Sequence, residues 1–318
     1  MIVVGGENLI DFIQVEKSGG RPEYRANAGG SPYNCAKALG RLGESVAYLT
    51  PISSDSLGGF LAKELEDAGV NLLGDRREEP SSLAVVSIGE GGAPSYGFYR
   101  DGTAERQVTA QKLEEWMPSE ARAFQLGSLS ITDGEDAEEW KEFFSTIKGR
   151  GLITSLDPNV RAAFIPDRDS YLARLDRLLS QVDLLKLSDE DLEWIAPEKP
   201  VPEAAAELLE GSSASLAVVT LGAEGSFALR PDGTKVEAMA AATREVVDTV
   251  GAGDVFMGAL LAGLSKRSLL NPEGLKLMGD TVIGELLGEA STAAAINCES
   301  EGCSPPDRDA LSARLEAE

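Results

Sequence analysis

The residues best placed to do chemistry form the stretch Asp248-Thr249-Val250-Gly251-Ala252-Gly253-Asp254, which a helical pattern follows. Small residues at a helix start let backbone N–H groups converge on an anion, and the helix dipole adds to the attraction. The amides of Gly251, Ala252 and Gly253 could therefore stabilise a phosphoryl group during its transfer. Asp254, in the first turn of the helix, could accept the proton of an attacking hydroxyl. The alternative is an ordinary glycine-rich turn with Asp254 as a helix cap.

The composition narrows the choice of catalytic group. The chain contains no histidine, which excludes Ser-His-Asp, Cys-His and histidine–zinc mechanisms. Acid–base chemistry must then fall to Asp, Glu, Lys, Tyr or Cys. The glycine-rich stretch is not a dinucleotide fingerprint, because Phe256 stands where the third glycine should be, and the chain has no P-loop sequence.

The overall charge restricts the partners. The 318 residues carry a net charge of −24, and this acidity argues against nucleic acid. It reflects either a highly soluble surface or adaptation to high internal salt, and the sequence does not decide between them. No apolar run approaches the roughly 20 residues that cross a bilayer, and the N-terminus lacks the pattern of a signal peptide. The three cysteines show no disulfide or zinc-ligand spacing. We therefore expect a cytoplasmic protein without a membrane or nucleic-acid partner.

Short apolar runs alternate with longer helical patterns over most of the chain. The predicted strands are Ile2–Gly5, Val46–Leu49, Ala123–Leu126, Leu152–Leu156, Leu184–Lys186, Leu216–Thr220 and Glu245–Val247, with a hairpin of Ser226–Leu229 and Val236–Ala238. The predicted helices include Tyr33–Leu42, Leu57–Ala68, Glu135–Lys148 and Tyr171–Leu179. This alternation predicts βαβ units, and hence an α/β fold whose mainly parallel sheet is covered on both faces. Ligands of such sheets bind beyond the carboxyl ends of the strands.

Two early regions break this alternation. Leu9–Glu16 and Leu83–Tyr99 read as extended segments with turn signals at Ser18–Gly20 and Gly91–Pro94, and no helical pattern follows them directly. They fit a small antiparallel sheet inserted into the α/β body, where it could serve as a lid.

The glycine-rich stretch resembles the C-terminal signature D-T-x-G-A-G-D of the ribokinase-like (PfkB-type) carbohydrate kinases, and Asn27–Ala36 resembles the N-terminal signature of the same family. Two signatures far apart in the chain, in the family's order, favour the kinase interpretation over a plain turn. The resemblance implies one three-layer α/β/α domain over residues 1–318, with a β-sheet lid from segments at about 9–26 and 83–108. It also implies a homodimer.

The resemblance implies a set of sugar contacts. These residues are Asp11, Gly29, Gly30, Asn34, Phe98, Arg100 and Arg161. The evidence for the last three is an F-Y-R-x-x-[ST]-A segment within Tyr96–Ala104 and a D-x-N-x-R box at Asp157–Arg161. Plainer interpretations remain open: Asp11 as a solvated turn residue, Asn34 as a helix-start residue, and the aromatic segment as strand packing.

The resemblance also implies a set of nucleotide contacts. These residues are Asn159, Ser188, Thr220, Gly222, Gly225, Asp248, Gly251, Gly253 and Asn297. Lys186–Asp191 corresponds to the segment that carries the family's N-x-x-E motif. Ser188 stands at the Asn position of that motif and Asp191 at the Glu position. Asp191 is expected to hold Mg²⁺ through water. A charged helix N-terminus is the alternative for this segment. The sequence leaves open whether a monovalent cation such as K⁺ is also required.

The implied reaction is transfer of the γ-phosphate of MgATP to a hydroxyl of a ketose. Fructose is the expected acceptor, with the 6-phosphate as the usual product and the 1-phosphate as the less common one. The closest rival acceptor is 2-keto-3-deoxygluconate, whose carboxylate would exploit Arg100 and Arg161; a nucleoside fits the motifs less well. A sugar- or nucleotide-binding regulator with weak activity is disfavoured, because the Gly251–Asp254 run is intact.

Overall fold

A nine-stranded sheet forms the centre of the molecule in the computed structural model, which describes residues 1–18, 21–88 and 94–317. Its strand order is β15-β14-β13-β12-β11-β10-β1-β4-β6. The strands from β6 across to β13 run parallel, and β14 and β15 add antiparallel at one edge. Their bounds are β1 Ile2–Val4, β4 Val46–Tyr48, β6 Asn71–Leu72, β10 Ala123–Gly127, β11 Ile153–Asp157, β12 Leu184–Ser188, β13 Leu216–Thr220, β14 Ser226–Leu229 and β15 Lys235–Ala238. The predicted parallel sheet and C-terminal hairpin are confirmed.

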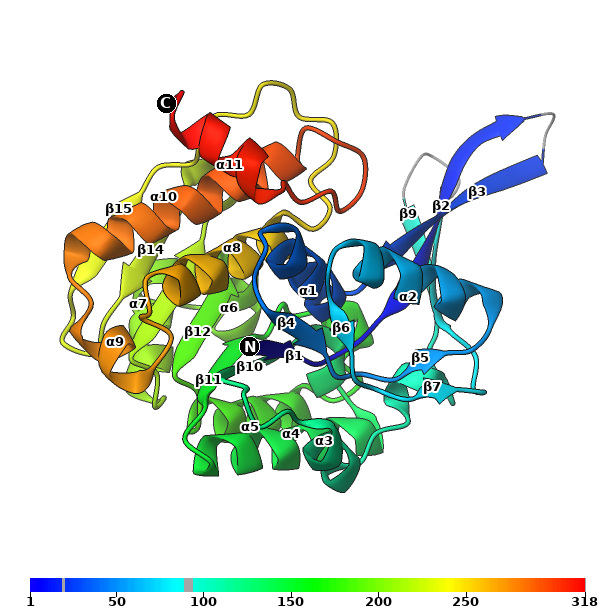
Figure 1. The fold of residues 1–318 in the computed structure, drawn as a ribbon, viewed down its shortest axis with the longest axis horizontal. Coiled ribbons are helices and arrows are strands. Elements are labelled where there is room, and N and C mark those ends of the chain that lie inside the picture. Colours follow the sequence, from blue (N-terminus) through cyan, green and yellow to red (C-terminus); the bar gives the residue numbers. More distant parts are fainter. Residues whose placement is uncertain (19–20, 89–93, 318) are drawn as a thin grey trace.

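Helices cover both faces of this sheet (Figure 1). One face packs against α1 (Ser31–Arg41), α2 (Ser56–Asp67), α8 (Ala252–Lys266), α9 (Pro272–Leu277) and α10 (Asp280–Asn297), with α11 (Arg308–Leu315) outside α10. The other face packs against α3 (Ala110–Trp116), α4 (Gly134–Gly149), α5 (Arg168–Leu179), α6 (Asp189–Ile195) and α7 (Val201–Glu210). Successive side chains of β1 point to opposite faces of the sheet. Ile2 and Val4 pack into the core on the α1 and α8 side, and Val3 packs into the second core, on the α4 and α5 side. The three-layer α/β/α prediction is confirmed.

A four-stranded sheet of order β3-β2-β8-β9 stands apart from the body and projects beyond α2 (Figure 1). It consists of β2 Leu9–Ser18, β3 Arg21–Gly29, β8 Ser82–Ile88 and β9 Pro94–Tyr99. Each hairpin is antiparallel as predicted, but β2 and β8 pair in parallel, since both leave the body in the same direction. Of the predicted turns, Gly19, Gly20 and Gly91–Ala93 lie outside the described residues. We call this sheet the lid sheet. A separate pair, β5 Ile52–Ser53 and β7 Arg76–Arg77, lies near α2.

The prediction of a strand at Glu245–Val247 is wrong. This segment has no regular secondary structure, and Val246 and Val247 are 60% and 50% exposed. The N–H of Val247 donates to the carbonyl oxygen of Cys298 at 2.8 Å, so the segment is tied to the chain after α10 and not to a sheet. Val246 lines a cavity and does not occupy a position in a sheet. Its apolar side chain therefore produced a strand-like pattern where no strand forms.

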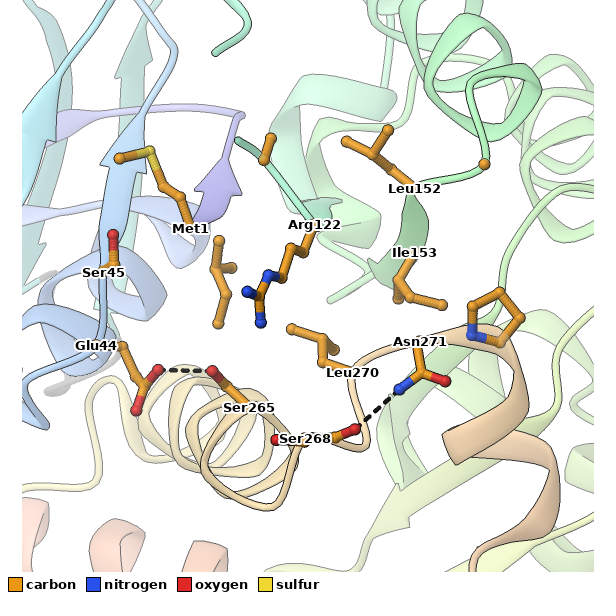
Figure 2. A pocket seen from close by; sticks show the side chains of 14 residues that line it. Met1, Glu44, Ser45, Arg122, Leu152, Ile153, Ser265, Ser268, Leu270 and Asn271 are labelled. Carbon is orange, nitrogen blue, oxygen red and sulfur yellow. Dashed lines mark hydrogen bonds between the residues drawn. The ribbon is translucent and has the colours of Figure 1, made fainter. Parts of the chain in front are cut away.

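A cavity of about 440 Å³ opens at the amino ends of β1, β4, β10 and β11 (Figure 2). Arg122 projects into it, and its one lining carboxylate, Glu44, accepts a hydrogen bond from the Ser265 hydroxyl at 2.7 Å. Ligands of parallel sheets bind at the opposite, carboxyl ends of the strands, so we expect the active site at those ends. Among the described helices, none is long and apolar enough to cross a membrane.

Trp140 provides a test of the second core. It is 1% exposed and contacts the rings of Phe124 and Phe143. Trp140→Ala should lower the free energy of unfolding by about 3–5 kcal/mol, because it leaves a large cavity beneath the sheet. Equilibrium urea unfolding measures this loss. Phe60→Ala, at a 38% exposed position, is the control and should cost far less; equal losses would contradict the assigned core.

Candidate active site

The carboxyl ends of β11, β12 and β13 border a cavity of about 730 Å³ that the lid sheet also lines. Most of the predicted site residues line it together. They are Asp11, Gly30, Asn34, Phe98, Asn159, Arg161, Ser188, Thr220, Gly222, Gly251, Ala252, Gly253 and Asp254. We call this space the polar cavity. It brings the two sequence signatures together, because Gly30 and Asn34 at the start of α1 line it beside the first residues of α8.

The glycine-rich stretch forms a tight turn that leads into α8. Gly251 precedes the helix with φ = 76°, a left-handed conformation that favours glycine. The N–H of Ala252 donates to the carbonyl oxygen of Thr249 at 3.2 Å and closes the turn. The Ala252 amide, which was predicted to stabilise an oxyanion, is therefore used within the turn. Gly251 and Gly253 line the cavity at the positive end of the helix dipole, where an anion would be attracted.

Three side chains hold the carboxylate of Asp254, which is 6% exposed. Its Oδ1 accepts hydrogen bonds from Ser31 Oγ at 2.7 Å and from Asn159 Nδ2 at 3.3 Å. Its Oδ2 accepts a hydrogen bond from Asn34 Nδ2 at 2.8 Å. Because these donors come from α1 and from the segment after β11, they fix the orientation of the carboxylate at the boundary between the glycine-rich turn and the rest of the cavity.

Two further carboxylates lie toward the lid side of the polar cavity. Burial raises the pKa of Glu7 to about 7, although the charge of Arg100 and the hydrogen bond from the Ser31 amide oppose this shift. Burial also raises the pKa of Asp11 to about 6, with Arg161 opposing the shift and Asp254 adding to it. This end of the cavity is therefore rich in carboxyl groups that can accept or donate hydrogen bonds to hydroxyls.

A second cavity of about 620 Å³ adjoins the first. Both are lined by Thr220, Gly222, Thr249, Ala252 and Gly253, so the turn before α8 lies between them. The rest of its lining is mainly apolar and includes Gly225, Ala240, Ala241, Ala242, Val246, Phe256, Ala294, Ala295 and Cys298. We call it the apolar cavity. An apolar space next to an anion-binding turn is suited to the base of a nucleotide whose phosphates reach the turn.

Five predicted residues line neither cavity: Gly29, Arg100, Asp191, Asp248 and Asn297. A side chain at Gly29 would place its Cβ 2.3 Å from Asp11 Oδ2, so this glycine leaves room for Asp11. Arg100 is 8% exposed, and its guanidinium donates to Glu105 at 2.9 Å and to the carbonyl oxygen of Leu129 at 3.5 Å. The pairing with Glu105 holds Arg100 at the base of the lid sheet, where it lines a separate cavity next to Phe98.

The other three residues hold the surrounding backbone. Asp191 accepts from the amides of Val160 at 2.6 Å and Ser188 at 2.8 Å, one at each oxygen. Asp248 accepts from the amides of Val250 at 3.0 Å and Gly302 at 2.9 Å.

Asn297 also holds the backbone. Its side chain donates to the carbonyl oxygen of Val250 at 2.9 Å and accepts from the amide of Ser304 at 2.7 Å. Asp248 and Asn297 thereby tie the glycine-rich turn to the segment after α10.

The described residues contain no group of three or more His, Cys, Asp or Glu side chains that could hold a metal by themselves. In the predicted metal segment, Asp189 and Glu190 line the polar cavity, whereas Asp191 does not. A small number of carboxylates suits Mg²⁺, which keeps several waters and is bound largely by substrate phosphates. The residues present therefore fit a metal that arrives with a nucleotide.

Sequence reasoning did not single out Glu7, Ser31 or Lys186, all of which line the polar cavity. Ser31 belongs to the N-terminal signature and directly follows Gly30, so the sequence could have indicated that it lies in the site. Glu7 comes shortly after β1, at the carboxyl end of a central strand. Lys186 was the clearest missed signal, because a lysine inside an apolar strand is rarely buried without a partner.

The turn, the adjacent carboxylate and the paired cavities form the geometry of a phosphotransferase. Residues 1–310 match the sequence profile of the pfkB family carbohydrate kinases, so the chain belongs to that family and is an ATP-dependent sugar kinase.

Three relatives illustrate the similarity. A fructokinase of Rhizobium leguminosarum bv. trifolii is 35% identical over 271 residues, covering 85% of this chain and 81% of the relative. Fructokinase-1 of Zea mays is 29% identical, covering 96% of this chain and 94% of the relative. The crystal structure of a fructokinase with bound ATP from Xylella fastidiosa is 27% identical, with a TM-score of 0.91 and coverage of 99% and 98% of the two chains.

The raised pKa of Glu7 predicts a pH dependence of stability. Between the ordinary pKa of 4.5 and the folded value of about 7, the folded state holds a proton that the unfolded chain releases. The free energy of unfolding therefore falls as the pH rises through this window. Glu7→Gln keeps an acceptor for the Ser31 amide and removes this contribution, which is on the order of 3 kcal/mol.

Urea unfolding at pH 4.5 to 8 checks this prediction. Glu7→Gln should gain stability relative to the unsubstituted protein as the pH rises to about 7. Glu203→Gln, at an exposed position of α7, is the control and should parallel the unsubstituted protein. Parallel curves for Glu7→Gln as well would contradict the assigned burial of the charge.

Proposed function

We propose that the protein transfers the γ-phosphate of ATP to a hydroxyl of fructose. The observation that carries this proposal is the position of Asp254, which lies at the boundary between the glycine-rich turn and the carboxyl-rich end of the polar cavity. A hydroxyl bound beside Asp254 would face a phosphoryl group bound at the turn. The similarity to fructokinases over most of the chain supports fructose as the acceptor.

The proposed reaction is an in-line displacement. Asp254 accepts the proton of the sugar hydroxyl while the hydroxyl oxygen forms a bond to the γ-phosphorus. The bond between that phosphorus and the oxygen that bridges it to the β-phosphate breaks, and ADP leaves with the electron pair. The amides of Gly251 and Gly253 and the dipole of α8 stabilise charge on the phosphoryl oxygens. Asp254 needs no histidine to perform this step, in agreement with the composition.

The two cavities suggest where each substrate binds. The base of ATP would occupy the apolar cavity, and its phosphates would pass Thr220 and Gly222 to reach the turn. Mg²⁺ bound to those phosphates would neutralise charge on them. We propose Asp189 and Glu190 as the carboxylates nearest to it, since both oxygens of Asp191 accept backbone hydrogen bonds.

The sugar would occupy the lid side of the polar cavity, among Asp11, Asn34 and Phe98. The Phe98 ring packs against Phe164 with centroids 3.9 Å apart and could cover an apolar face of the sugar. Arg100 is paired with Glu105, which leaves Arg161 as the predicted sugar-binding cation that lines the cavity. This arrangement favours a neutral ketose over the carboxylate of 2-keto-3-deoxygluconate, for which two arginines were expected.

The expected homodimer stays a prediction. The lid sheet ends in β3 and β9, whose outer edges have no strand partner among the described residues. Tyr24 and Tyr99, on these two strands, are 39% and 63% exposed. Unpaired strand edges with exposed aromatic residues are suited to pairing between copies of the chain.

Asp254→Asn tests the proposed base. The substitution keeps the size of the side chain but removes its ability to take a proton, so kcat with fructose should fall by at least about 100-fold. Affinity for ADP, measured by isothermal titration calorimetry, should change little. Asp309→Asn, the same change at an exposed position of α11 outside both cavities, is the matched control and should keep kcat near the unsubstituted value. Turnover of Asp254→Asn near the unsubstituted value would show that another group removes the proton.

The acceptor itself is tested by ATP consumption with fructose, 2-keto-3-deoxygluconate, ribose and adenosine at equal concentrations. Fructose should give the highest kcat/KM, because the cavity binds hydroxyls with carboxyl groups and holds Arg100 away from the substrate. A higher kcat/KM with 2-keto-3-deoxygluconate would contradict fructose while leaving the kinase assignment intact. Arg161→Gln should then abolish the preference for that acid.

A further inference from the structure

Lys186 on β12 is buried directly beneath the glycine-rich turn. The residue is 3% exposed, and its Nζ donates a hydrogen bond to Asp157 Oδ2 at 3.0 Å. A Cβ placed on Gly253 would lie 3.2 Å from the same Nζ, so the ammonium group is next to the backbone of the turn. Lys186 also lines the polar cavity, together with Gly251, Gly253 and Asp254. Lys186 is thus a buried cation within the space where the phosphoryl group would move.

We propose that Lys186 is a further catalytic residue, whose ammonium group donates a hydrogen bond to a non-bridging oxygen of the γ-phosphoryl group during its transfer. The proposal rests on the phosphoryl transfer described above but not on the identity of the sugar. Lys186 keeps its proton throughout, while Asp254 takes the proton of the hydroxyl. The ammonium group supplies positive charge on the side of the turn that faces β12.

The distribution of charge in the polar cavity supports this role. Its described lining contains the carboxyl groups of Glu7, Asp11, Asp189, Glu190 and Asp254, but only two cations, Arg161 and Lys186. The charge of Arg161 acts on Asp11, which places it toward the lid side. Lys186 is therefore the cation on the phosphate side. In a chain with a net charge of −24, a polyanion entering this site needs such a local positive charge.

The surroundings of Lys186 keep it charged. Burial lowers its pKa, but the charges of Asp157 and Asp191 and the hydrogen bond to Asp157 outweigh burial and leave the pKa above its ordinary value. An ammonium group has three donors, and Asp157 accepts one of them. The others can reach a ligand without loss of the ion pair. Removal of a single preorganised hydrogen-bond donor to a developing oxyanion typically lowers kcat by about 100- to 1,000-fold.

A purely structural ion pair is the competing explanation, and it predicts different behaviour. Removing Lys186 alone would leave the buried Asp157 unpaired and destabilise the fold. The double variant Lys186→Gln/Asp157→Asn avoids this, because two amides can hydrogen-bond without a buried charge. Asp157→Asn is the matched control, since it changes the partner and keeps the cation. Asp157→Asn loses the ion pair but keeps the ammonium group, whereas the double variant loses both. Comparing the two isolates the effect of the ammonium charge.

The experiment measures kcat and two affinities for these variants, with thermal unfolding as the check on folding. The affinities are those for MgADP and for a magnesium complex of a non-hydrolysable ATP analogue, both without sugar. For Lys186→Gln/Asp157→Asn we expect kcat to fall about 100- to 1,000-fold. The ATP analogue should bind at least about fivefold more weakly, while affinity for ADP changes less than about threefold. Asp157→Asn should retain kcat within about tenfold.

Two outcomes would overturn the proposal. One is a double variant whose kcat stays within about threefold of the unsubstituted value. The other is an equal loss of affinity for ADP and for the ATP analogue, as a distorted site would give. Because both affinities are measured without sugar, they test Lys186 even if the protein does not phosphorylate fructose. Failure of the acceptor assignment and failure of the Lys186 proposal are therefore distinguishable.

Discussion

The packing of α1 against α8 determines where the carboxylate of Asp254, the proposed catalytic base, lies. A Cβ on Gly258 of α8 would lie 2.8 Å from Ala38 Cβ and 3.1 Å from the carbonyl oxygen of Cys35, both on α1. This close approach brings the first turns of the two helices together. Ser31 and Asn34 on α1 can then hydrogen-bond to Asp254 on α8 at 2.7 and 2.8 Å. The two distant signatures of the sequence meet at this contact, and the polar cavity forms around it.

The rest of the site balances buried charge around Asp254. The carboxyl groups of Glu7, Asp11 and Asp157 all have raised pKa values because burial disfavours their ionised forms. Cations oppose each shift: Arg100 beside Glu7, Arg161 beside Asp11, and Lys186 beside Asp157. In the proposed binding mode, the glycine-rich turn, the dipole of α8 and Lys186 concentrate positive potential in one place, which would let an acidic protein bind a polyanion here.

Much of this structure follows from local sequence patterns. The parallel sheet and its flanking helices were predictable because their periodicities of apolar residues reflect burial on one or both faces. The hairpins of the lid sheet were predictable from extended segments with turn signals between them. The strand expected at Glu245–Val247 is absent because this segment borders the apolar cavity, a tertiary effect that overrides propensity. The parallel pairing of β2 with β8 depends on a long-range contact that no local pattern encodes.

The sequence motifs located most of the lining of the polar cavity, but not the contacts that each residue makes. Motifs identified Asp254 and the turn, whereas the partners of Arg100, Asp191 and Asn297 are set by tertiary contacts. Short polar motifs cannot distinguish a residue that touches substrate from one that holds the backbone around it. Ser31 and Lys186 illustrate the converse, because their importance arises only from what the fold places beside them.

The most direct test of Asp254 as the base is a crystal structure with fructose and a non-hydrolysable ATP analogue bound together. We expect one fructose hydroxyl within about 2.6–3.2 Å of the Asp254 carboxylate. The terminal phosphoryl group should lie at the amides of Gly251 and Gly253, so that the hydroxyl stands between this group and the Asp254 carboxylate. Fructose bound away from Asp254, for example in the cavity at the amino ends of the strands, would contradict this assignment.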